Sequence, residues 1–121
     1  MRLIAAAVLA ASLVTACSQS PSPPPRTVTG GDPDRGLAAI EAHGCVSCHV
    51  VPGASESESA WVGPPLTRYA RRSYVAGVMV NNEENLVRWI MDPKSVDRRT
   101  AMPDLDVSDS EARDIAAYLY S

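Results

Sequence analysis

Two cysteines and a histidine stand close together near the middle of the chain, in the order Cys45-Val46-Ser47-Cys48-His49. Two thiols at this spacing can add to the two vinyl groups of a haem, and the histidine that follows can place its imidazole beneath the iron. The same pair of cysteines also occurs in redox-active disulfides and in zinc sites.

The surrounding sequence argues against both alternatives. A thioredoxin-type pair would follow a strand within a βαβ unit, and no such pattern precedes Cys45. A zinc site would need further ligands at suitable spacing, and the one other histidine, His43, is too close along the backbone to share a tetrahedral metal comfortably with Cys45, Cys48 and His49. The motif therefore predicts covalent attachment of one haem.

Residues 1–16 have the character of a signal peptide. A single basic residue, Arg2, precedes an apolar stretch from Leu3 to Ala16. That stretch is too short for a permanent membrane-spanning helix but suits the apolar core of a signal peptide. We expect export of the chain and removal of this segment.

Cys17 follows Leu13-Val14-Thr15-Ala16, which resembles the lipobox of bacterial lipoproteins. The resemblance implies that Cys17 becomes the lipid-bearing N-terminus of an anchored protein on the periplasmic side, with the inner or outer membrane left open. An ordinary cleavage site beside a cysteine is the alternative. The cysteine count favours lipidation, because a haem uses two of the three cysteines and leaves Cys17 without a partner.

Composition divides the remainder into a tether, residues 17–31, and a single domain, residues 32–121. Ser18 to Pro25 holds four prolines and three serines with no periodic apolar residues, which is typical of an extended linker. Without residues 1–16 the chain has 10 basic and 14 acidic side chains, so nucleic-acid binding is not expected. The chain has no phenylalanine and only six aromatic residues, so we expect the domain to need its haem in order to fold.

Helix signals dominate the domain. Asp32 and Pro33 predict a helix start, and Gly44 predicts its end just before the first motif cysteine. Asn82 predicts a second helix that runs to about Asp92, with a short helix between Leu66 and Tyr74 as a further possibility. Turn-rich stretches at 50–62 and 93–107 predict loops. The last helix has the clearest signal, a capping box at Ser108-Asp109-Ser110-Glu111 followed by apolar residues at helical spacing.

Two further stretches have ambiguous roles from their residues alone. Gly63-Pro64-Pro65-Leu66 could present a backbone carbonyl to the second nitrogen of the His49 ring, or could be an ordinary turn. Met102 stands in a polar, irregular stretch, where a methionine is more often a filler than a metal ligand.

Taken together, these residues resemble the class I, mitochondrial-like cytochrome c family, and within it the short bacterial cytochromes associated with terminal oxidases. The resemblance covers about residues 32–121. It rests on Gly36 nine residues before Cys45, on the haem motif, on Gly63-Pro64-Pro65-Leu66, on the helix end at Pro93, and on Thr100-Ala101-Met102-Pro103. It implies an all-α fold of three to five helices around one covalent haem c, with crossing N- and C-terminal helices.

The resemblance also implies roles for single residues. His49 would be the proximal iron ligand and Met102 the distal ligand, with Met79, Met91 and His43 as poorer rivals. Pro64 would offer its carbonyl to His49, and Trp89 would lie near the methionine sulfur. The family places groups that bind the haem propionates at Arg72 and Thr100, with Tyr74 as a further candidate.

The function implied is electron transfer rather than catalysis. A lipid-anchored carrier would pass single electrons from a donor such as a quinol-oxidising complex to a membrane-bound terminal oxidase. A haem peroxidase, a haem-based gas or redox sensor, and a fixed subunit of a larger oxidoreductase are the alternatives. The family's lysine before the distal methionine is Ala101 here, so we expect Arg98 and Arg99 to replace it in partner docking.

Overall fold

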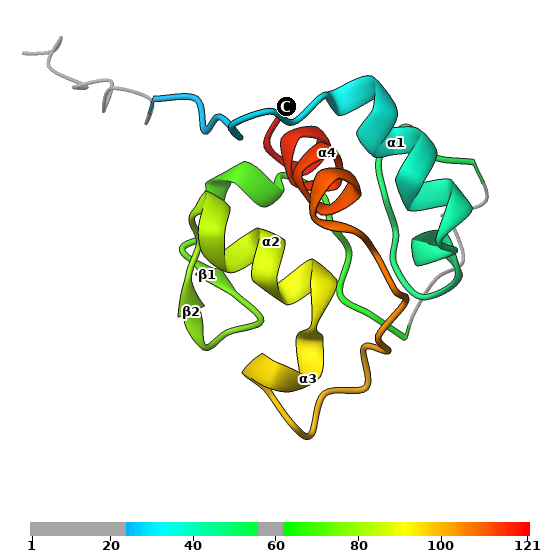
Figure 1. The fold of residues 1–121 in the computed structure, drawn as a ribbon, viewed down its shortest axis with the longest axis vertical. Coiled ribbons are helices and arrows are strands. Elements are labelled where there is room, and N and C mark those ends of the chain that lie inside the picture. Colours follow the sequence, from blue (N-terminus) through cyan, green and yellow to red (C-terminus); the bar gives the residue numbers. More distant parts are fainter. Residues whose placement is uncertain (1–23, 56–61) are drawn as a thin grey trace, which may run out of the picture.

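The computed structural model describes residues 24–55 and 62–121. The expected signal peptide, Cys17 and the start of the tether therefore lie outside the described residues, as does the centre of the loop after His49. Helices dominate the described part, and Figure 1 shows them packed around one another with a small hairpin at one side. Its elements are α1 (Pro33–Ala42), two 3-10 turns (Cys45–Ser47 and Tyr69–Arg71), β1 (Tyr74–Val75), β2 (Met79–Val80), α2 (Glu83–Met91), α3 (Pro93–Val96) and α4 (Asp109–Tyr120).

Helix α1 begins and ends where its sequence predicts. The Asp32 carboxylate accepts a hydrogen bond from the Arg35 backbone N–H, 2.9 Å away, and Pro33 occupies the first turn. Gly44 takes the left-handed conformation, with φ of 71°, and its N–H donates to the Glu41 carbonyl. This turn ends the helix and leads the chain directly into Cys45.

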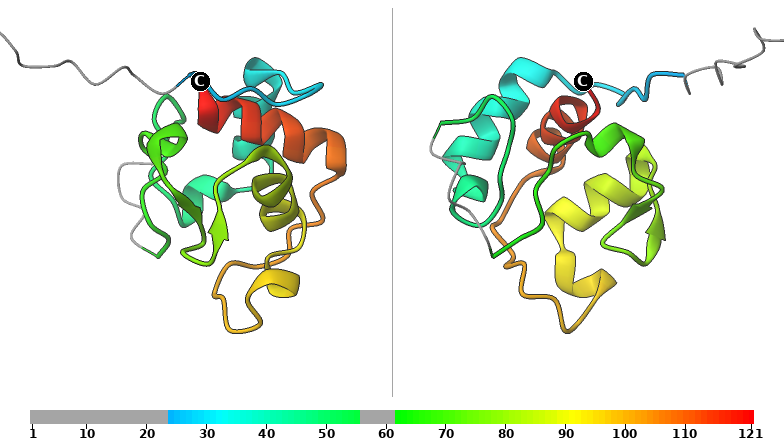
Figure 2. Two further views of the ribbon diagram at one scale, coloured as in Figure 1. Left: turned by 90° about the vertical axis from the view of Figure 1, so that its left-hand side faces the viewer. Right: turned by 180° about the vertical axis from the view of Figure 1, so that it is seen from behind.

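Helices α1 and α4 cross, as Figures 1 and 2 show, and Gly36 of α1 lies against α4. A Cβ atom at position 36 would lie 2.6 Å from the Asp114 carbonyl carbon and 2.9 Å from the Tyr118 Cβ. Only glycine allows this approach. Tyr118 packs over Gly36, so the expected crossing of the N- and C-terminal helices is confirmed. The two helices bury Ile40 and Ile115 between them and the rest of the core.

Side-chain caps define the other long helices. The Asn82 side chain accepts from the Asn85 N–H at 2.9 Å to begin α2, which buries Leu86 and Ile90. The capping box at the start of α4 is present in both directions between Ser108 and Glu111. Pro93 ends α2 as expected, but it also begins the short helix α3, where the sequence predicts only a loop.

Two further features differ from the expectation. Between residues 66 and 74 the chain forms only the 3-10 turn Tyr69–Arg71 and no short α-helix. An antiparallel hairpin follows, in which Tyr74 pairs with Val80 and Val75 with Met79. Two residues per strand give no readable alternation in the sequence, so the hairpin had no signal. None of the described residues forms a helix long and apolar enough to cross a membrane.

Candidate functional site

The haem motif forms one tight turn at the end of α1. The Cys45 carbonyl accepts from both the Cys48 N–H, at 3.2 Å, and the His49 N–H, at 2.9 Å. The turn therefore gathers the two thiols and the imidazole at one end of the domain. Burial raises the pKa of the Cys45 thiol, although a backbone hydrogen bond opposes the shift.

The Gly63-Pro64 segment supports the His49 ring. The Pro64 carbonyl accepts a hydrogen bond from His49 Nδ1 at 2.7 Å, and the Gly63 N–H donates to the Cys48 carbonyl at 2.7 Å. A Cβ atom at position 63 would lie 2.5 Å from Nδ1 and 2.8 Å from Nε2, so this glycine leaves the space that the ring fills. With Nδ1 engaged, Nε2 is the ring nitrogen available to a metal.

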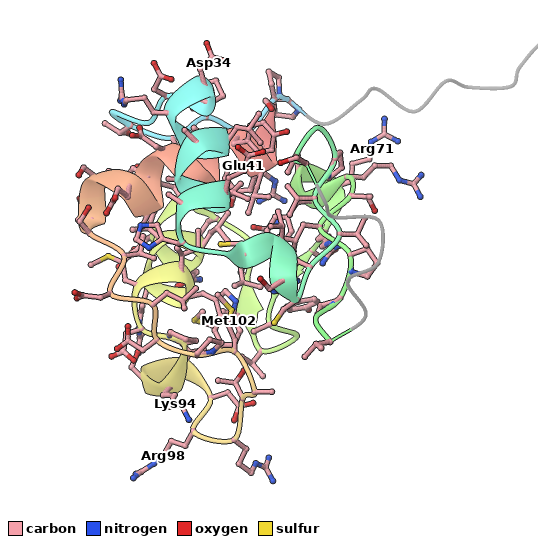
Figure 3. All side chains as sticks on the ribbon, turned by 90° about the vertical axis from the view of Figure 1, so that its right-hand side faces the viewer. Asp34, Glu41, Arg71, Lys94, Arg98 and Met102 are labelled. Carbon is pink, nitrogen blue, oxygen red and sulfur yellow. The ribbon has the colours of Figure 1, made fainter. Side chains whose placement is uncertain are left out.

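A cavity of about 230 Å³ lies beside this ring. Five separate stretches of the chain line it: the haem motif, residues 62–66, residues 69–76, Trp89 of α2, and the loop 100–103. Seven of the site residues expected from the sequence line it, namely Cys48, His49, Pro64, Arg72, Trp89, Thr100 and Met102. Figure 3 shows Met102 near the centre of the domain in this view, whereas Lys94 and Arg98 extend outward at its lower end.

The donor set of this cavity fits a haem c. Its lining offers the Cys48 thiol for one vinyl group, an imidazole nitrogen and a thioether sulfur for the iron, and a guanidinium and a hydroxyl for the propionates. The second thiol would come from Cys45, in the same turn as Cys48. The Thr100 hydroxyl also accepts from the Met102 N–H at 3.1 Å, which fixes the backbone that carries the sulfur. Zinc fits less well, because no group of three or more His, Cys, Asp and Glu side chains within the described residues could hold a metal ion.

Other candidates lie apart from the cavity. Tyr74 is 58% exposed, because the alternation along β1 turns the buried Val75 inward and Tyr74 outward. Met79 and Met91 pack against the hydrophobic core and do not line the cavity. His43 is engaged with Glu111, whose Oε1 lies 3.2 Å from His43 Nε2. Cys45 does not line the cavity but packs beside it against the core.

Sequence reasoning missed Tyr69. Its ring is buried and lines the cavity, and the Arg72 guanidinium carbon lies 4.8 Å from the ring centroid. Burial raises the pKa of the Tyr69 hydroxyl, although Arg72 opposes the shift. In the sequence, the one indication of a role for Tyr69 was Arg72, three residues later. A tyrosine near an arginine is too common a pattern to identify a site residue.

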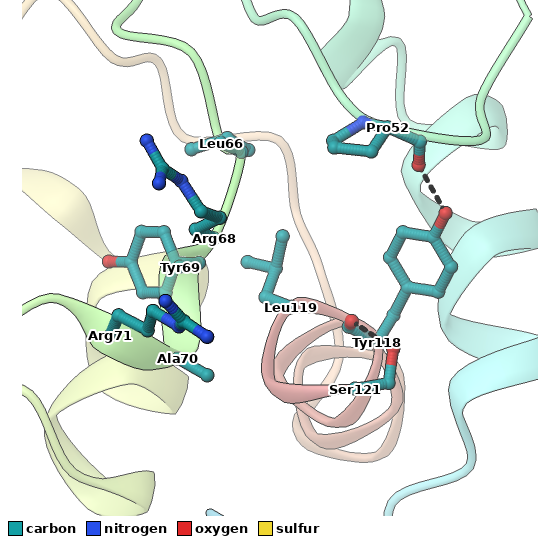
Figure 4. A pocket seen from close by; sticks show the side chains of 9 residues that line it. All are labelled: Pro52, Leu66, Arg68, Tyr69, Ala70, Arg71, Tyr118, Leu119 and Ser121. Atoms are coloured by element: carbon teal, nitrogen blue, oxygen red, sulfur yellow. Dashed lines mark hydrogen bonds between the residues drawn. The ribbon is translucent and has the colours of Figure 1, made fainter. Parts of the chain in front are cut away.

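A second cavity, of about 250 Å³, lies on the other side of Leu66 and Tyr69, next to the end of α4. Figure 4 shows its lining, with Arg68 and Arg71 to one side and the Tyr118 hydroxyl donating to the Pro52 carbonyl on the other. Neither an imidazole nor a sulfur atom lines it. The first cavity is therefore the candidate haem site.

Comparisons with known proteins identify the family of the chain. The model of the cytochrome c family matches residues 33–121. The chain is 35% identical over 89 residues to cytochrome c oxidase subunit 2 of Alkalihalophilus pseudofirmus and 34% identical over 88 residues to the protein of that name from Bacillus subtilis. These matches cover 73% and 70% of this chain but 25% of each relative, so the chain spans about a quarter of the length of the curated relatives it matches.

The fold resembles a solved structure as well. Cytochrome c2 from Rhodobacter sphaeroides superposes with a TM-score of 0.57 over 74% of this chain and 94% of its own, at 24% sequence identity. This likeness supports the all-α fold, and the family match supports a covalent haem c as the cofactor. The chain therefore belongs to the cytochrome c family, and its fold is that of a class I cytochrome c.

Proposed function

We propose that the protein carries single electrons through a haem c ligated by His49 and Met102. The supporting observation is that both side chains line one cavity, while Nδ1 of His49 is engaged by the Pro64 carbonyl. When bound, the haem would supply one-electron exchange between Fe(II) and Fe(III), and a methionine sulfur together with a histidine nitrogen as ligands would favour a high reduction potential.

The chain's own residues hold the ligands still. The hydrogen bond to Pro64 fixes the plane of the His49 ring and increases the basicity of Nε2. The hydrogen bond to Thr100 holds the backbone at Met102. With His49 and Met102 both bound to it, the iron would offer no position to a substrate, which favours a carrier over a peroxidase or a gas sensor.

Absorption spectroscopy of the purified holoprotein tests the ligands. We expect haem that survives denaturation, together with the far-red band of methionine sulfur bound to Fe(III). Met102→Ala should abolish that band, lower the reduction potential and allow carbon monoxide to bind the reduced protein, whereas Met79→Ala and Met91→Ala should change none of these. A band that persists in Met102→Ala would contradict the assignment.

The proposed electron acceptor is a membrane-bound terminal oxidase. The relatives named cytochrome c oxidase subunit 2 support this acceptor. The expected class of donor is a quinol-oxidising complex, as the family resemblance implies. Arg98 and Arg99 are exposed and immediately precede Thr100 of the cavity lining. An oxidase with an acidic docking surface would therefore meet positive charge beside the haem, and the electron-transfer rate should fall as salt is added.

A fixed subunit of a larger oxidoreductase is the second candidate. It is favoured by one observation, that the matching segment forms part of a much longer subunit in these relatives. Purification from membranes in mild detergent separates the two. A free carrier should leave the oxidase during gel filtration, whereas a fixed subunit should remain with it at a constant ratio.

Anchoring through Cys17 completes the proposal, with residues 1–16 as the signal peptide and the domain on the periplasmic side. A lipid tether would raise the local concentration of the carrier at membrane-bound partners. Cys17→Ser should release the holoprotein into the soluble periplasmic fraction. Equal membrane retention of the variant would contradict a lipid anchor at this residue.

A further inference from the structure

Arg26 precedes the segment that the family model matches, yet its side chain is part of the folded domain. The half-buried guanidinium donates three hydrogen bonds to backbone carbonyls. Its Nε reaches Ala70 at 2.9 Å, its Nη2 reaches Arg72 at 3.3 Å, and its Nη1 bonds to Asn81. Each nitrogen of the planar fork therefore has a different carbonyl.

Asn81 holds the same segment from the inside of the domain. Its side chain is 2% exposed, and its Nδ2 donates to the carbonyls of Tyr69, at 3.1 Å, and Arg72, at 3.0 Å. Its Oδ1 accepts from the Tyr120 hydroxyl at 2.7 Å. The Arg26 guanidinium carbon lies 5.6 Å from the centroid of the Tyr120 ring. Arg26 and Asn81 therefore both contact Tyr120 at the end of α4.

The segment held in this way forms one wall of the haem cavity. Tyr69 and Arg72 line that cavity, and the Arg72 guanidinium, besides lying over the Tyr69 ring, donates to the Pro65 carbonyl. The 3-10 turn begins after Arg68, which has a φ of 50° in the left-handed region. A short turn that starts in this conformation depends on outside contacts to keep its shape.

We propose that Arg26 is a positioning residue for the haem site. It fixes the backbone of residues 69–72 and thereby sets where the Tyr69 ring and the Arg72 guanidinium lie against the haem. Arg26 itself does not line the cavity, so it acts only through that wall. The inference rests on the proposed function in one respect, that this cavity is the one that holds the haem.

Two substitutions in the full-length holoprotein separate positioning from charge. Arg26→Met removes both the hydrogen bonds and the charge, whereas Arg26→Lys keeps the charge but cannot reach three separate carbonyls with one nitrogen. Arg35→Met is the matched control, because Arg35 also ties the N-terminal part to α4, through Asp114, without touching the cavity wall.

The measurements are the reduction potential, the far-red methionine band and amide hydrogen exchange of Arg72, whose N–H donates to the Tyr69 carbonyl. We expect both Arg26 variants to keep the band, to exchange this amide faster and to have a lower potential. A positive guanidinium near the iron disfavours the additional charge of Fe(III), so displacing the Arg72 guanidinium should favour Fe(III) and lower the potential. Arg35→Met should lose thermal stability while its potential and its Arg72 exchange remain those of the parent protein.

Two results would overturn the proposal. A parent-like potential in both Arg26 variants would show that the wall does not depend on Arg26. A parent-like potential in Arg26→Lys beside a lowered one in Arg26→Met would assign the effect to charge instead of position. If Arg26→Met fails to fold, the reduction potential and the Arg72 amide exchange of Arg26→Lys still test whether Arg26 positions the cavity wall. Absence of the band in the parent protein would instead contradict the ligation by Met102 and leave the exchange result as the test of Arg26.

Discussion

Gly63 lies directly against the ring of His49, the proposed iron ligand. Its backbone does not adopt the left-handed conformation, so the lack of a side chain is what the position requires. A methyl group there would overlap the His49 ring, and neither the ring nor the Pro64 carbonyl that holds it can move freely. Space beside the ligand is thus as necessary as the ligand.

We predict that Gly63→Ala destabilises the holoprotein by roughly 1–3 kcal/mol, the usual cost of overpacking. It should also weaken the far-red band, because the ring must shift. Denaturant unfolding and absorption spectra measure the two effects. Gly77→Ala is the control, since it strains a positive φ in open space and should leave the band unchanged. A parent-like band in Gly63→Ala would contradict the clash.

Tyr120 gives a prediction at high pH. Burial raises the pKa of its hydroxyl to about 12, and the neutral hydroxyl donates to Asn81. Because the folded value lies above the ordinary value of 10.0, the stability from this group is present below pH 10 and is lost as the pH rises toward 12. Alkaline titration of tyrosinate absorbance should show this late ionisation, and Tyr120→Phe should remove it. Complete ionisation of every tyrosine near pH 10 would contradict the assignment.

At the scale of the elements, the crossing of α1 and α4 combines a steric and an ionic contact. Gly36 allows the close approach, and Asp114 of α4 accepts from the Arg35 guanidinium at 2.8 and 2.9 Å and from the Asp32 N–H at 2.8 Å. One carboxylate therefore binds both the start of α1 and its first turn. The crossing requires this carboxylate to be charged.

Acid should weaken the crossing. The hydrogen bond from Arg35, and also that from Asp32, lowers the pKa of Asp114 below its ordinary 3.8, although partial burial opposes the shift. A lowered folded value means that the stability is present above about pH 3.8 and is lost as the pH falls further. Glu111, whose pKa is lowered by Ser108 and His43, adds to the same loss.

We therefore predict a steep fall in melting temperature below this pH for the parent protein and a shallower one for Asp114→Asn, which starts from a melting temperature several degrees lower. Melting temperature followed by circular dichroism measures both slopes. Asp104→Asn is the control, because Asp104 is exposed in the loop before α4. An acid slope in Asp114→Asn equal to that of the parent would contradict the role of the carboxylate.

The molecule as a whole is built around the haem cavity. Its lining comes from five separate stretches of the chain, and the core includes Tyr69, which also lines the cavity. Without the haem, these parts would face water across an unfilled space, and a domain this small with six aromatic residues has little other apolar surface to bury.

We predict that a double variant, Cys45→Ala with Cys48→Ala, which cannot attach haem, is largely unfolded. Far-ultraviolet circular dichroism should show most of the helix signal lost and no cooperative thermal transition. The parent holoprotein under the same conditions is the control. A cooperative transition in the haem-free variant would contradict the dependence of the fold on its cofactor.

The sequence by itself determined the elements whose signals are local. Caps at Asp32, Asn82 and Ser108, the stop at Gly44 and the spacing of the haem motif all act within a few residues, so they can be read along the chain. The resemblance to a family then brought Met102, Thr100 and Trp89 to one site, which composition and periodicity could not have done. The ligand roles of these residues stay predictions.

Only the tertiary structure decided the contacts between distant segments. Arg26 bonds to carbonyls 44 to 55 residues away, and Tyr74 turns outward on a hairpin too short to leave a pattern. Because every residue has a backbone carbonyl, the sequence does not indicate which carbonyls will accept hydrogen bonds from a guanidinium. The wall of the haem cavity is therefore set by hydrogen bonds that a sequence does not display, whereas the helices and the haem attachment are set by side chains that it does.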